Sequence, residues 1–245
     1  MSQQSLTSAK NNFDSMKGLN PYFFLDYDGT LVPLITEPEK AFADDELKEL
    51  LMRLYSKYRT FIITGRSLTE IDTLLGMKLN SIGWHGAMAR IDGKLIYLMD
   101  NADYYLNAID SLMDMQDYFE KKYPGLRMMD KRPGVLFLLW GNSEAQIADL
   151  ENELIDIAHK RGLAVITGKQ IIELIPPGTG KGNAIRKIRN GSPCIVIGDD
   201  LTDEDSFSKN GDCLTIKVGP GKTSAKVRFD SIDEVRDFLE YAVSA

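Results

Sequence analysis

Residues 22–31 read Tyr22-Phe23-Phe24-Leu25-Asp26-Tyr27-Asp28-Gly29-Thr30-Leu31. Four apolar residues of strand-forming type run directly into two carboxylates, and a Gly-Thr pair then turns the chain. This pattern predicts a buried strand that ends in an acidic loop. Ligands bind at the carboxyl ends of strands in a parallel α/β sheet, whereas an Asp inside a strand would be desolvated at a cost. Asp26 is therefore the candidate reactive group, although a surface turn with two solvated acids would read the same way.

The length and composition limit the classes of protein that fit. A chain of 245 residues is long enough for one large domain or for a core domain with a smaller inserted one. A hydrophobic content of 43% and a charged content of 27% are those of a soluble globular protein. The net charge of -7 argues against a nucleic-acid partner, and the acids gathered in the motifs suggest a bound cation. No apolar run approaches the roughly 20 residues of a membrane span, and we expect a cytoplasmic monomer with no membrane partner.

The N-terminus and the cysteines bear on the same question. Residues 1–20 are rich in Ser, Gln and Asn and lack the apolar region of a signal peptide, so we expect a flexible arm. Cys194 and Cys213 both fall in apolar strand-like runs. We expect buried free thiols in a reducing cytosol, with a disulfide as the alternative. His85 and His159 are the two histidines, which disfavours a His-rich zinc site.

Two further strands end in polar groups. The β-rich run 59–63 stops at Thr64-Gly65-Arg66, just before a capping box that opens a helix, and helix N-termini bind anions. The apolar run 193–197 ends in Gly198-Asp199-Asp200-Leu201-Thr202-Asp203-Glu204-Asp205. Lys181 follows a Gly-Thr-Gly turn and opens the helix before that run. Because parallel strands end at a common edge of the sheet, we expect these groups to meet.

The alternation of strands and helices breaks in the middle of the chain. Between residues 87 and 173, adjacent strands and longer helices predict an α+β insertion, which begins with a hairpin around Asp92-Gly93. The predicted fold is therefore α/β. A Rossmann-like parallel-sheet core spans residues 21–86 and 174–245, and an α+β cap domain spans residues 87–173.

The Asp-x-Asp-Gly-Thr-Leu motif, taken with the later groups, resembles the haloacid dehalogenase superfamily of phosphatases. The resemblance implies that Asp26 is the nucleophile and a Mg²⁺ ligand, and that Asp199 is the distal metal carboxylate. Asp28 would be the acid-base residue and would offer its backbone carbonyl to the metal. A carboxylate that attacks phosphorus is itself anionic, so a hard, oxygen-seeking cation is needed to offset the repulsion.

The same resemblance assigns supporting roles around these groups. Lys181 and Thr64 would hold the phosphate. Asp200 and Asp203 would contact the direct metal ligands and support them. Each has a plainer reading. A Lys beside glycines is often a solvated loop residue, and acids such as Asp203 are common in the first turn of a helix.

The segments Gly-Asp-Asp-x-Thr-Asp-Glu-x-x-Phe at 198–207 and His85-Gly86-Ala87 are similar to those of trehalose-6-phosphate phosphatases. This resemblance implies a cap that closes over the leaving group. It also implies a set of substrate-binding residues, namely Gly65, Arg66, His85, Gly86, Lys131 and Arg132. The cap departs from the family pattern, because Met129 stands where Glu is expected and Leu138-Leu139-Trp140 where His-Tyr-Arg is expected. Trp84 and Trp140 could stack on a sugar or pack in the core.

The function expected from the resemblance is Mg²⁺-dependent hydrolysis of trehalose 6-phosphate to trehalose and phosphate through a phosphoaspartate. Three alternatives stay open. The substrate could be another sugar phosphate or phosphoglycoside, the enzyme could be a sugar-phosphate mutase, or the chain could bind a sugar phosphate without catalysis.

Overall fold

The computed structural model describes residues 2–139, 141, 143–168 and 170–245. The chain divides into two compact units, one formed by residues 1–98 and 180–245 and the other by residues 99–179. Within the described residues, no helix combines the length and the apolar character needed to cross a membrane.

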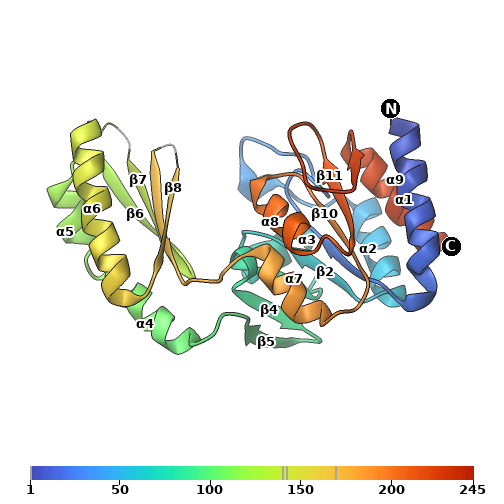
Figure 1. Cartoon of the computed structure of the whole chain (residues 1–245), viewed down its shortest axis with the longest axis horizontal. Coiled ribbons are helices and arrows are strands. Elements are labelled where there is room, and N and C mark those ends of the chain that lie inside the picture. The colour runs from blue at the N-terminus through green and yellow to red at the C-terminus, as the bar shows by residue number, and fades with distance from the viewer. Residues whose placement is uncertain (1, 140, 142, 169) are drawn as a thin grey trace. The chain divides into compact units, whose positions relative to one another are not determined.

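The first unit is built on an eight-stranded sheet in the described part of the chain, with strand order β12-β11-β10-β1-β2-β3-β4-β5 (Figure 1). The strands from β12 to β3 are parallel to their neighbours, and β4 and β5 close the edge as an antiparallel hairpin. The predicted α/β fold with a parallel core sheet is confirmed. The strand bounds are β1 Tyr22–Leu25, β2 Thr60–Ile63, β3 Ser81–Gly83, β4 Met88–Ile91, β5 Lys94–Tyr97, β10 Cys194–Gly198, β11 Leu214–Val218 and β12 Val227–Phe229.

Helices cover both faces of this sheet. The helix bounds are α1 Ser2–Met16, α2 Asp45–Lys57, α3 Leu68–Leu75, α7 Lys181–Arg189, α8 Leu201–Lys209 and α9 Ile232–Ser244, with short 3-10 turns at η1 Lys17–Leu19, η2 Pro38–Lys40 and η3 Trp84–Gly86. Alternate residues of each strand point to opposite faces, so Phe23 and Leu25 pack with α1, α2, α3 and α9. Phe24 points the other way and packs with α7 and α8. Strand β1 is therefore buried on both faces, as its continuous apolar sequence predicts.

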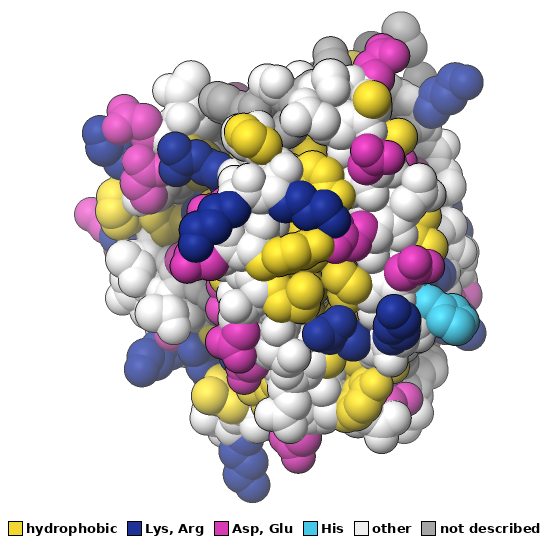
Figure 2. Space-filling model, turned by 90° about the vertical axis from the view of Figure 1, so that its left-hand side faces the viewer, with side chains coloured by type: hydrophobic (Ala, Val, Ile, Leu, Met, Phe, Trp, Pro, Cys, Tyr) yellow, Lys and Arg dark blue, Asp and Glu magenta, His cyan; other side chains and the backbone are white. Residues whose placement is uncertain are grey.

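In its described residues, the second unit is a four-stranded antiparallel sheet in the order β6-β7-β9-β8 with helices against one face. The bounds are α4 Ala102–Met113, α5 Gln116–Lys122, β6 Leu126–Lys131, β7 Gly134–Leu139, α6 Glu144–Arg161, β8 Ala164–Gly168 and β9 Ile171–Ile175. Ser143 and Gln146 form the capping box that starts α6. Figure 2 shows one face of the molecule, on which charged side chains of both signs lie among hydrophobic ones. The charge on this face is thus mixed rather than of one sign.

The prediction of a flexible N-terminal arm is wrong for residues 2–16, which form helix α1. Phe13 explains the difference. Its ring is fully buried and lies 6.1 Å from the ring of Phe23 and 6.0 Å from that of Phe238, between centroids. Phe13 and the fully buried Ala9 join the core, and Leu6 and Met16 pack against it, so a few apolar residues in a polar segment hold the helix, and composition alone does not reveal them.

The boundary of the insertion also differs from the prediction. The expected hairpin forms around Asp92-Gly93, but β4 pairs with β3 and thus belongs to the core sheet. The second unit therefore begins at Met99 rather than at residue 87, and it ends at Thr179. The reason is that β3 would otherwise leave an open sheet edge, whose backbone groups β4 satisfies.

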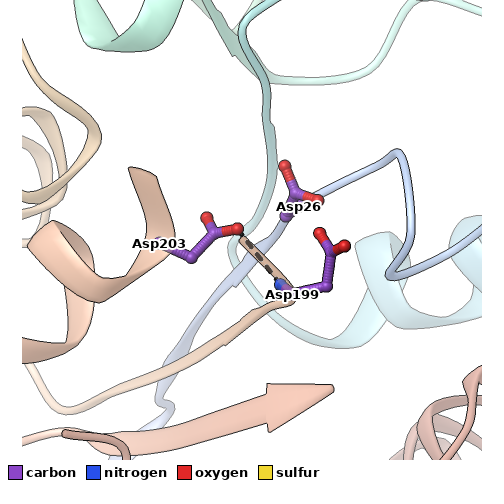
Figure 3. Close-up of side chains that lie close together, drawn as sticks. All are labelled: Asp26, Asp199 and Asp203. Atoms are coloured by element: carbon purple, nitrogen blue, oxygen red, sulfur yellow. Dashed lines mark hydrogen bonds between the residues drawn. The ribbon is translucent and has the colours of Figure 1, made fainter. Parts of the chain in front are cut away.

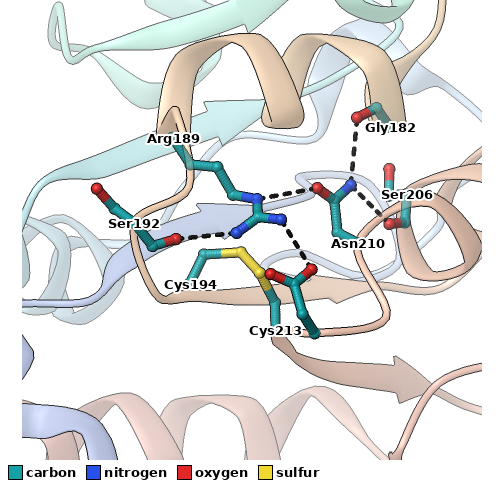
Figure 4. Close-up of a disulfide and its surroundings, with 8 residues drawn as sticks. Gly182, Arg189, Ser192, Cys194, Ser206, Asn210 and Cys213 are labelled. Atoms are coloured by element: carbon teal, nitrogen blue, oxygen red, sulfur yellow. Dashed lines mark hydrogen bonds and ion pairs between the residues drawn. A yellow bond between two sulfur atoms is a disulfide. The ribbon is translucent and has the colours of Figure 1, made fainter.

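The prediction of free thiols is wrong as well, because Cys194 and Cys213 form a disulfide (Figure 4). The two cysteines directly precede the paired residues Ile195 and Leu214 of neighbouring strands. Their Cα atoms are 5.0 Å apart, which is within the range that a disulfide spans. The disulfide was the alternative that the sequence left open. It can form because β10 and β11 are neighbours in the sheet, which brings the two cysteines together.

Candidate active site

Asp26 lies directly after the carboxyl end of β1, the strand that pairs with both β10 and β2. Its backbone N–H donates to the carbonyl of Ile197 at 2.9 Å, so the strand pairing continues to the point where the side chain leaves the sheet. The residue is only 5% exposed. Asp199 follows the end of the neighbouring strand β10, and Figure 3 shows the Asp26, Asp199 and Asp203 carboxylates close together at this edge.

Lys181 is the buried amine of the site. Its Nζ donates to Oδ1 of Asp26 at 2.6 Å and to Oδ1 of Asp203 at 2.9 Å. Lys181 is the first residue of α7, whose N-cap Gly180 offers no side-chain cap. Helix α8 supplies the missing acceptor, because Oδ2 of Asp205 accepts from the N–H of Gly182 at 3.1 Å. The start of α7, and with it Lys181, is therefore held by the neighbouring helix.

Asp200 and Asp203, in the acid cluster after β10, have different hydrogen-bond partners and different roles. Asp200 is the N-cap of α8, and its Oδ1 accepts from the N–H groups of Thr202 at 2.8 Å and Asp203 at 3.1 Å. Asp203 turns back to the loop, where its Oδ2 accepts from the N–H of Asp199 at 3.1 Å. Asp200 thus builds the helix, and Asp203 joins the Asp199 backbone to Lys181.

Burial dominates the electrostatics of these groups. It raises the pKa of Asp26 to about 6, because the attraction of Lys181 offsets only part of the desolvation and Asp199 adds repulsion. Burial and the neighbouring acids raise the pKa of Asp199 to about 6 and that of Asp203 above its usual range. Burial lowers the pKa of Lys181, but Asp26 and Asp203 outweigh it and the net shift is upward. Carboxylates that are costly to ionise together are those that a cation would stabilise.

The donor atoms fit a hard divalent cation. Asp26, Asp199 and Asp203 each offer a carboxylate oxygen, and these oxygens lie within 4.8 Å of one another. Carboxylate oxygens are the protein ligands that Mg²⁺ prefers. Gly29 makes room for this arrangement, since a Cβ at that position would lie 2.1 Å from Oδ2 of Asp199 and its φ is +80°. Only glycine fits where the Asp28-Gly29 turn meets the acid.

Asp28 is held by Arg66 in a two-pronged ion pair. Nε of Arg66 donates to Oδ2 at 2.7 Å, and Nη2 donates to Oδ1 at 2.6 Å. The same Nη2 donates to the carbonyl of Pro38 at 2.9 Å, which ties the loop after β1 to the pair. The structure therefore places Arg66, which was predicted to bind substrate, on the predicted acid-base residue.

The other predicted residues of the first unit surround this centre. Thr64 is buried at the end of β2, and its Oγ1 accepts from the N–H of Arg66 at 3.1 Å. His85 is exposed and packs against Gly65, where a Cβ would lie 2.4 Å from the imidazole. Gly86 abuts the start of α7, since a Cβ there would lie 2.5 Å from the Gly180 carbonyl oxygen. Trp84, one of the two tryptophans considered for sugar stacking, is half-buried.

The predicted cap residues lie in the second unit. Lys131 ends β6 and is exposed. Arg132 is engaged within its own unit, since Nε donates to Oδ2 of Asp130 at 3.0 Å and Nη2 pairs with Asp110. Trp140, the other candidate for stacking on a sugar, lies outside the described residues.

One residue of the centre was missed from the sequence. Lys217, in β11, is 5% exposed and donates through Nζ to the carbonyl of Asp199. The available signal was a lysine between Ile216 and Val218 in an otherwise apolar strand. A strand buried on both faces has no position where an amine reaches water, so its Lys needs a polar partner.

Known proteins resemble this chain in sequence and in fold. The family model "Trehalose-phosphatase" matches residues 24–240. The trehalose-6-phosphate phosphatase-related protein of Thermoplasma acidophilum is 40% identical over 89% of this chain and 95% of its own length. The bifunctional trehalose-6-phosphate synthase/phosphatase of Thermoproteus tenax is 32% identical over 98% of this chain, which spans only 34% of that larger protein. A solved trehalose-6-phosphate phosphatase-related protein is 39% identical with a TM-score of 0.75, and the match covers 91% of this chain and 97% of that one.

Proposed function

Since this chain belongs to the trehalose-phosphatase family of the haloacid dehalogenase superfamily, we propose that it hydrolyses trehalose 6-phosphate with Mg²⁺ and through a phosphoaspartate on Asp26. Membership makes the chain a phosphoric monoester hydrolase. The observation that supports the covalent route is the contact between Lys181 Nζ and Asp26 Oδ1 at 2.6 Å, inside a group of acids. A nucleophilic carboxylate needs a neighbouring positive charge to approach an anionic phosphate.

The first half of the reaction forms the phosphoenzyme. An oxygen of Asp26 attacks phosphorus, and the bond between phosphorus and the sugar oxygen breaks. The leaving sugar oxygen takes a proton from Asp28, so trehalose departs as a neutral alcohol. Lys181 fixes the direction of the attacking carboxylate, and Thr64 lies at the end of the adjacent strand β2, where its hydroxyl can meet a phosphate oxygen.

The second half releases phosphate. Asp28 accepts a proton from a water molecule, the water oxygen attacks phosphorus, and the bond to Asp26 breaks. At the end of the cycle Asp26 is again a free carboxylate, and Asp28 again carries a proton, which came from the water molecule and is available for the next turnover. Arg66 donates to both Asp28 oxygens, so it holds the ionised carboxylate that accepts the water proton in this half of the reaction.

We propose that Asp26 and Asp199 hold the Mg²⁺ ion together with the backbone carbonyl of Asp28. Bound there, the ion would neutralise the phosphate oxygens that approach Asp26. Asp203 does not bind the ion directly in this proposal, because its carboxylate already accepts hydrogen bonds from Lys181 and from the N–H of Asp199. It instead supports the residues around the ion. Asp200 acts on the helix rather than on the metal.

We propose that Lys131 binds the sugar, and that Gly65, His85 and Gly86 form the rim around the phosphate. Lys131 is the stronger candidate of the two cap residues, since the Arg132 guanidinium already has two carboxylate partners. The cytoplasmic location stays a prediction that cell fractionation can check, and the monomeric state stays one that sedimentation in solution can check.

A product assay with matched variants tests the proposal. Trehalose 6-phosphate, glucose 6-phosphate and another disaccharide phosphate are each incubated with the protein in Mg²⁺ or in EDTA, and free sugar and phosphate are measured. We expect equal amounts of trehalose and phosphate, a loss of activity in EDTA, and a loss of more than roughly a thousand-fold in Asp26→Asn. Asp44→Asn is the control, because Asp44 caps α2 outside the site and Asn preserves that cap.

Each part of the proposal can fail separately. An active Asp26→Asn enzyme contradicts the phosphoaspartate, and full activity in EDTA contradicts the metal. Equal kcat/KM for all three sugar phosphates contradicts trehalose 6-phosphate as the substrate. An isomerised sugar phosphate as product, in place of free phosphate, would make the protein a mutase.

A further inference from the structure

Lys217 is a buried lysine beside the acid cluster. It lies in β11 between Ile216 and Val218, and it pairs in the sheet with Gly198, the residue before Asp199. Its neighbours in the strand point to the apolar side covered by α1 and α9, so the Lys217 side chain points to the other face. Burying an ammonium in a strand is costly unless its donors are satisfied.

Among the described residues, the Lys217 ammonium donates two hydrogen bonds, and both go to backbone carbonyls. Nζ donates to the carbonyl of Val218 at 2.8 Å and to the carbonyl of Asp199. The bond to Val218 is local and would suffice to satisfy one donor. The bond to Asp199 reaches across to the loop that carries a predicted metal ligand, 18 residues earlier in the sequence.

The backbone of Asp199 is therefore held on both sides by side chains. Its N–H donates to Oδ2 of Asp203 at 3.1 Å, and its carbonyl accepts from Lys217. Asp203 comes from α8 and Lys217 from β11, so two different elements fix one residue. Because both peptide groups are fixed, the direction of the Asp199 carboxylate depends only on the torsion angles of its own side chain.

We propose that Lys217 is a positioning residue that fixes the Asp199 backbone, so that the Asp199 carboxylate is aimed at the cation that Asp26 shares. The inference rests on the proposed Mg²⁺ site. It does not make Lys217 a catalytic residue, since its amine reaches carbonyl oxygens rather than the reacting groups. Residues that orient metal ligands typically change metal affinity about 10- to 100-fold when they are mutated.

Two possible roles of Lys217, as a positive charge near Asp199 or as a residue that positions Asp199, predict opposite changes in Mg²⁺ affinity when the lysine is replaced. Lys217 also acts as a positive charge near Asp199, since its attraction lowers the pKa of that carboxyl against the larger effect of burial. If charge were its whole role, Lys217→Met would remove a repulsion and Mg²⁺ would bind more tightly. If Lys217 positions Asp199, the same variant binds Mg²⁺ more weakly.

The experiment is a calorimetric titration of the substrate-free protein with Mg²⁺. We expect the Kd of Lys217→Met to rise about ten-fold. Lys217→Arg keeps the charge but places its donors differently, and we expect a rise of about three-fold. Lys222→Met removes a charge from an exposed lysine of the loop after β11 and is expected to leave the Kd unchanged. Thermal unfolding in EDTA shows whether each variant is folded before it is titrated.

The outcomes separate this inference from the proposed function. If the parent protein binds Mg²⁺ and a folded Lys217→Met binds it equally well or more tightly, the positioning role is refuted and the function stands. If Lys217→Met does not fold, Lys217→Arg decides, and a Kd equal to that of the parent refutes the role. If the parent itself does not bind Mg²⁺, the proposed function fails and the inference fails with it.

Discussion

At the scale of single residues, the site depends on a few charges that are buried together. Lys181 has carboxylates at 2.6 Å and 2.9 Å and is itself almost fully buried. Such a group is strongly coupled, because removing one member leaves an uncompensated buried charge at a cost of about 3–5 kcal/mol. The arrangement adds little to stability, but it holds the carboxylate of Asp26, the proposed nucleophile, in a fixed direction.

Arg66 gives a prediction at the same scale. In Arg66→Ala the Asp28 carboxylate loses both of its guanidinium contacts and is free to rotate away from the leaving group. We expect kcat to fall roughly ten- to hundred-fold while KM changes less than about two-fold, because a misplaced acid-base group slows the chemistry without weakening binding. Steady-state kinetics with trehalose 6-phosphate would measure both.

Arg90 provides the matched control for that variant. It forms the same two-pronged pair with Asp72, at 2.6 Å and 2.7 Å, but between β4 and α3 and away from the acid cluster. Arg90→Ala should lower the Tm and leave kcat unchanged. A large rise in KM for Arg66→Ala, with kcat preserved, would instead support the substrate-binding role that the sequence predicted.

At the scale of elements, the disulfide joins β10 to the start of β11 at the end of the sheet opposite the acids. It closes a segment with a sequence separation of 19 residues. A loop of that size contributes about 3 kcal/mol in the chain-entropy model. We therefore expect reduction, or the double change Cys194→Ala with Cys213→Ala, to lower the free energy of unfolding by about that amount, as measured by urea denaturation.

Hydrogen bonds near the disulfide are expected to keep the local structure in place after the disulfide is reduced. Arg189, at the end of α7, ties this helix to the segment between α8 and β11, since it donates to Asn210 Oδ1 at 3.2 Å (Figure 4) and to Asp212 Oδ1 at 2.7 Å. Because these bonds persist without the disulfide, phosphate release below the unfolding range should change less than about two-fold. An unchanged urea midpoint on complete reduction would contradict the stabilising role.

These elements also show what a sequence can and cannot predict. The strands around Asp26 and Asp199 are continuous apolar runs that end in acids, and local pattern is enough to find them. The pairing of Cys194 with Cys213 and the hold of Lys217 on Asp199 depend on β11 lying beside β10, a neighbour relation that no local pattern contains. Helix α1 was missed for the same reason, because Phe13 holds it on the core by packing against rings that are distant in sequence.

At the scale of the whole molecule, folding brings acids together that the unfolded chain keeps apart. Burial raises the pKa of Asp26 to about 6 and that of Asp199 to about 6, against 3.8 for the free group. The folded protein without metal therefore binds more protons than the unfolded chain between about pH 4 and pH 6. The contribution of these two groups to the free energy of unfolding is present at low pH and is lost as the pH rises through about 6.

Mg²⁺ should reverse this loss, because it binds the ionised carboxylates of the folded state and competes with their protons. We expect the increase in Tm caused by Mg²⁺ to be small below about pH 5 and to reach its full size above about pH 7. Calorimetric unfolding in Mg²⁺ and in EDTA at each pH measures this difference and cancels the other titrating groups. Asp199→Asn is the matched variant and should lose the increase at every pH. An increase of the same size at pH 5 and pH 7.5 would mean that Mg²⁺ stabilises the fold somewhere other than at these acids.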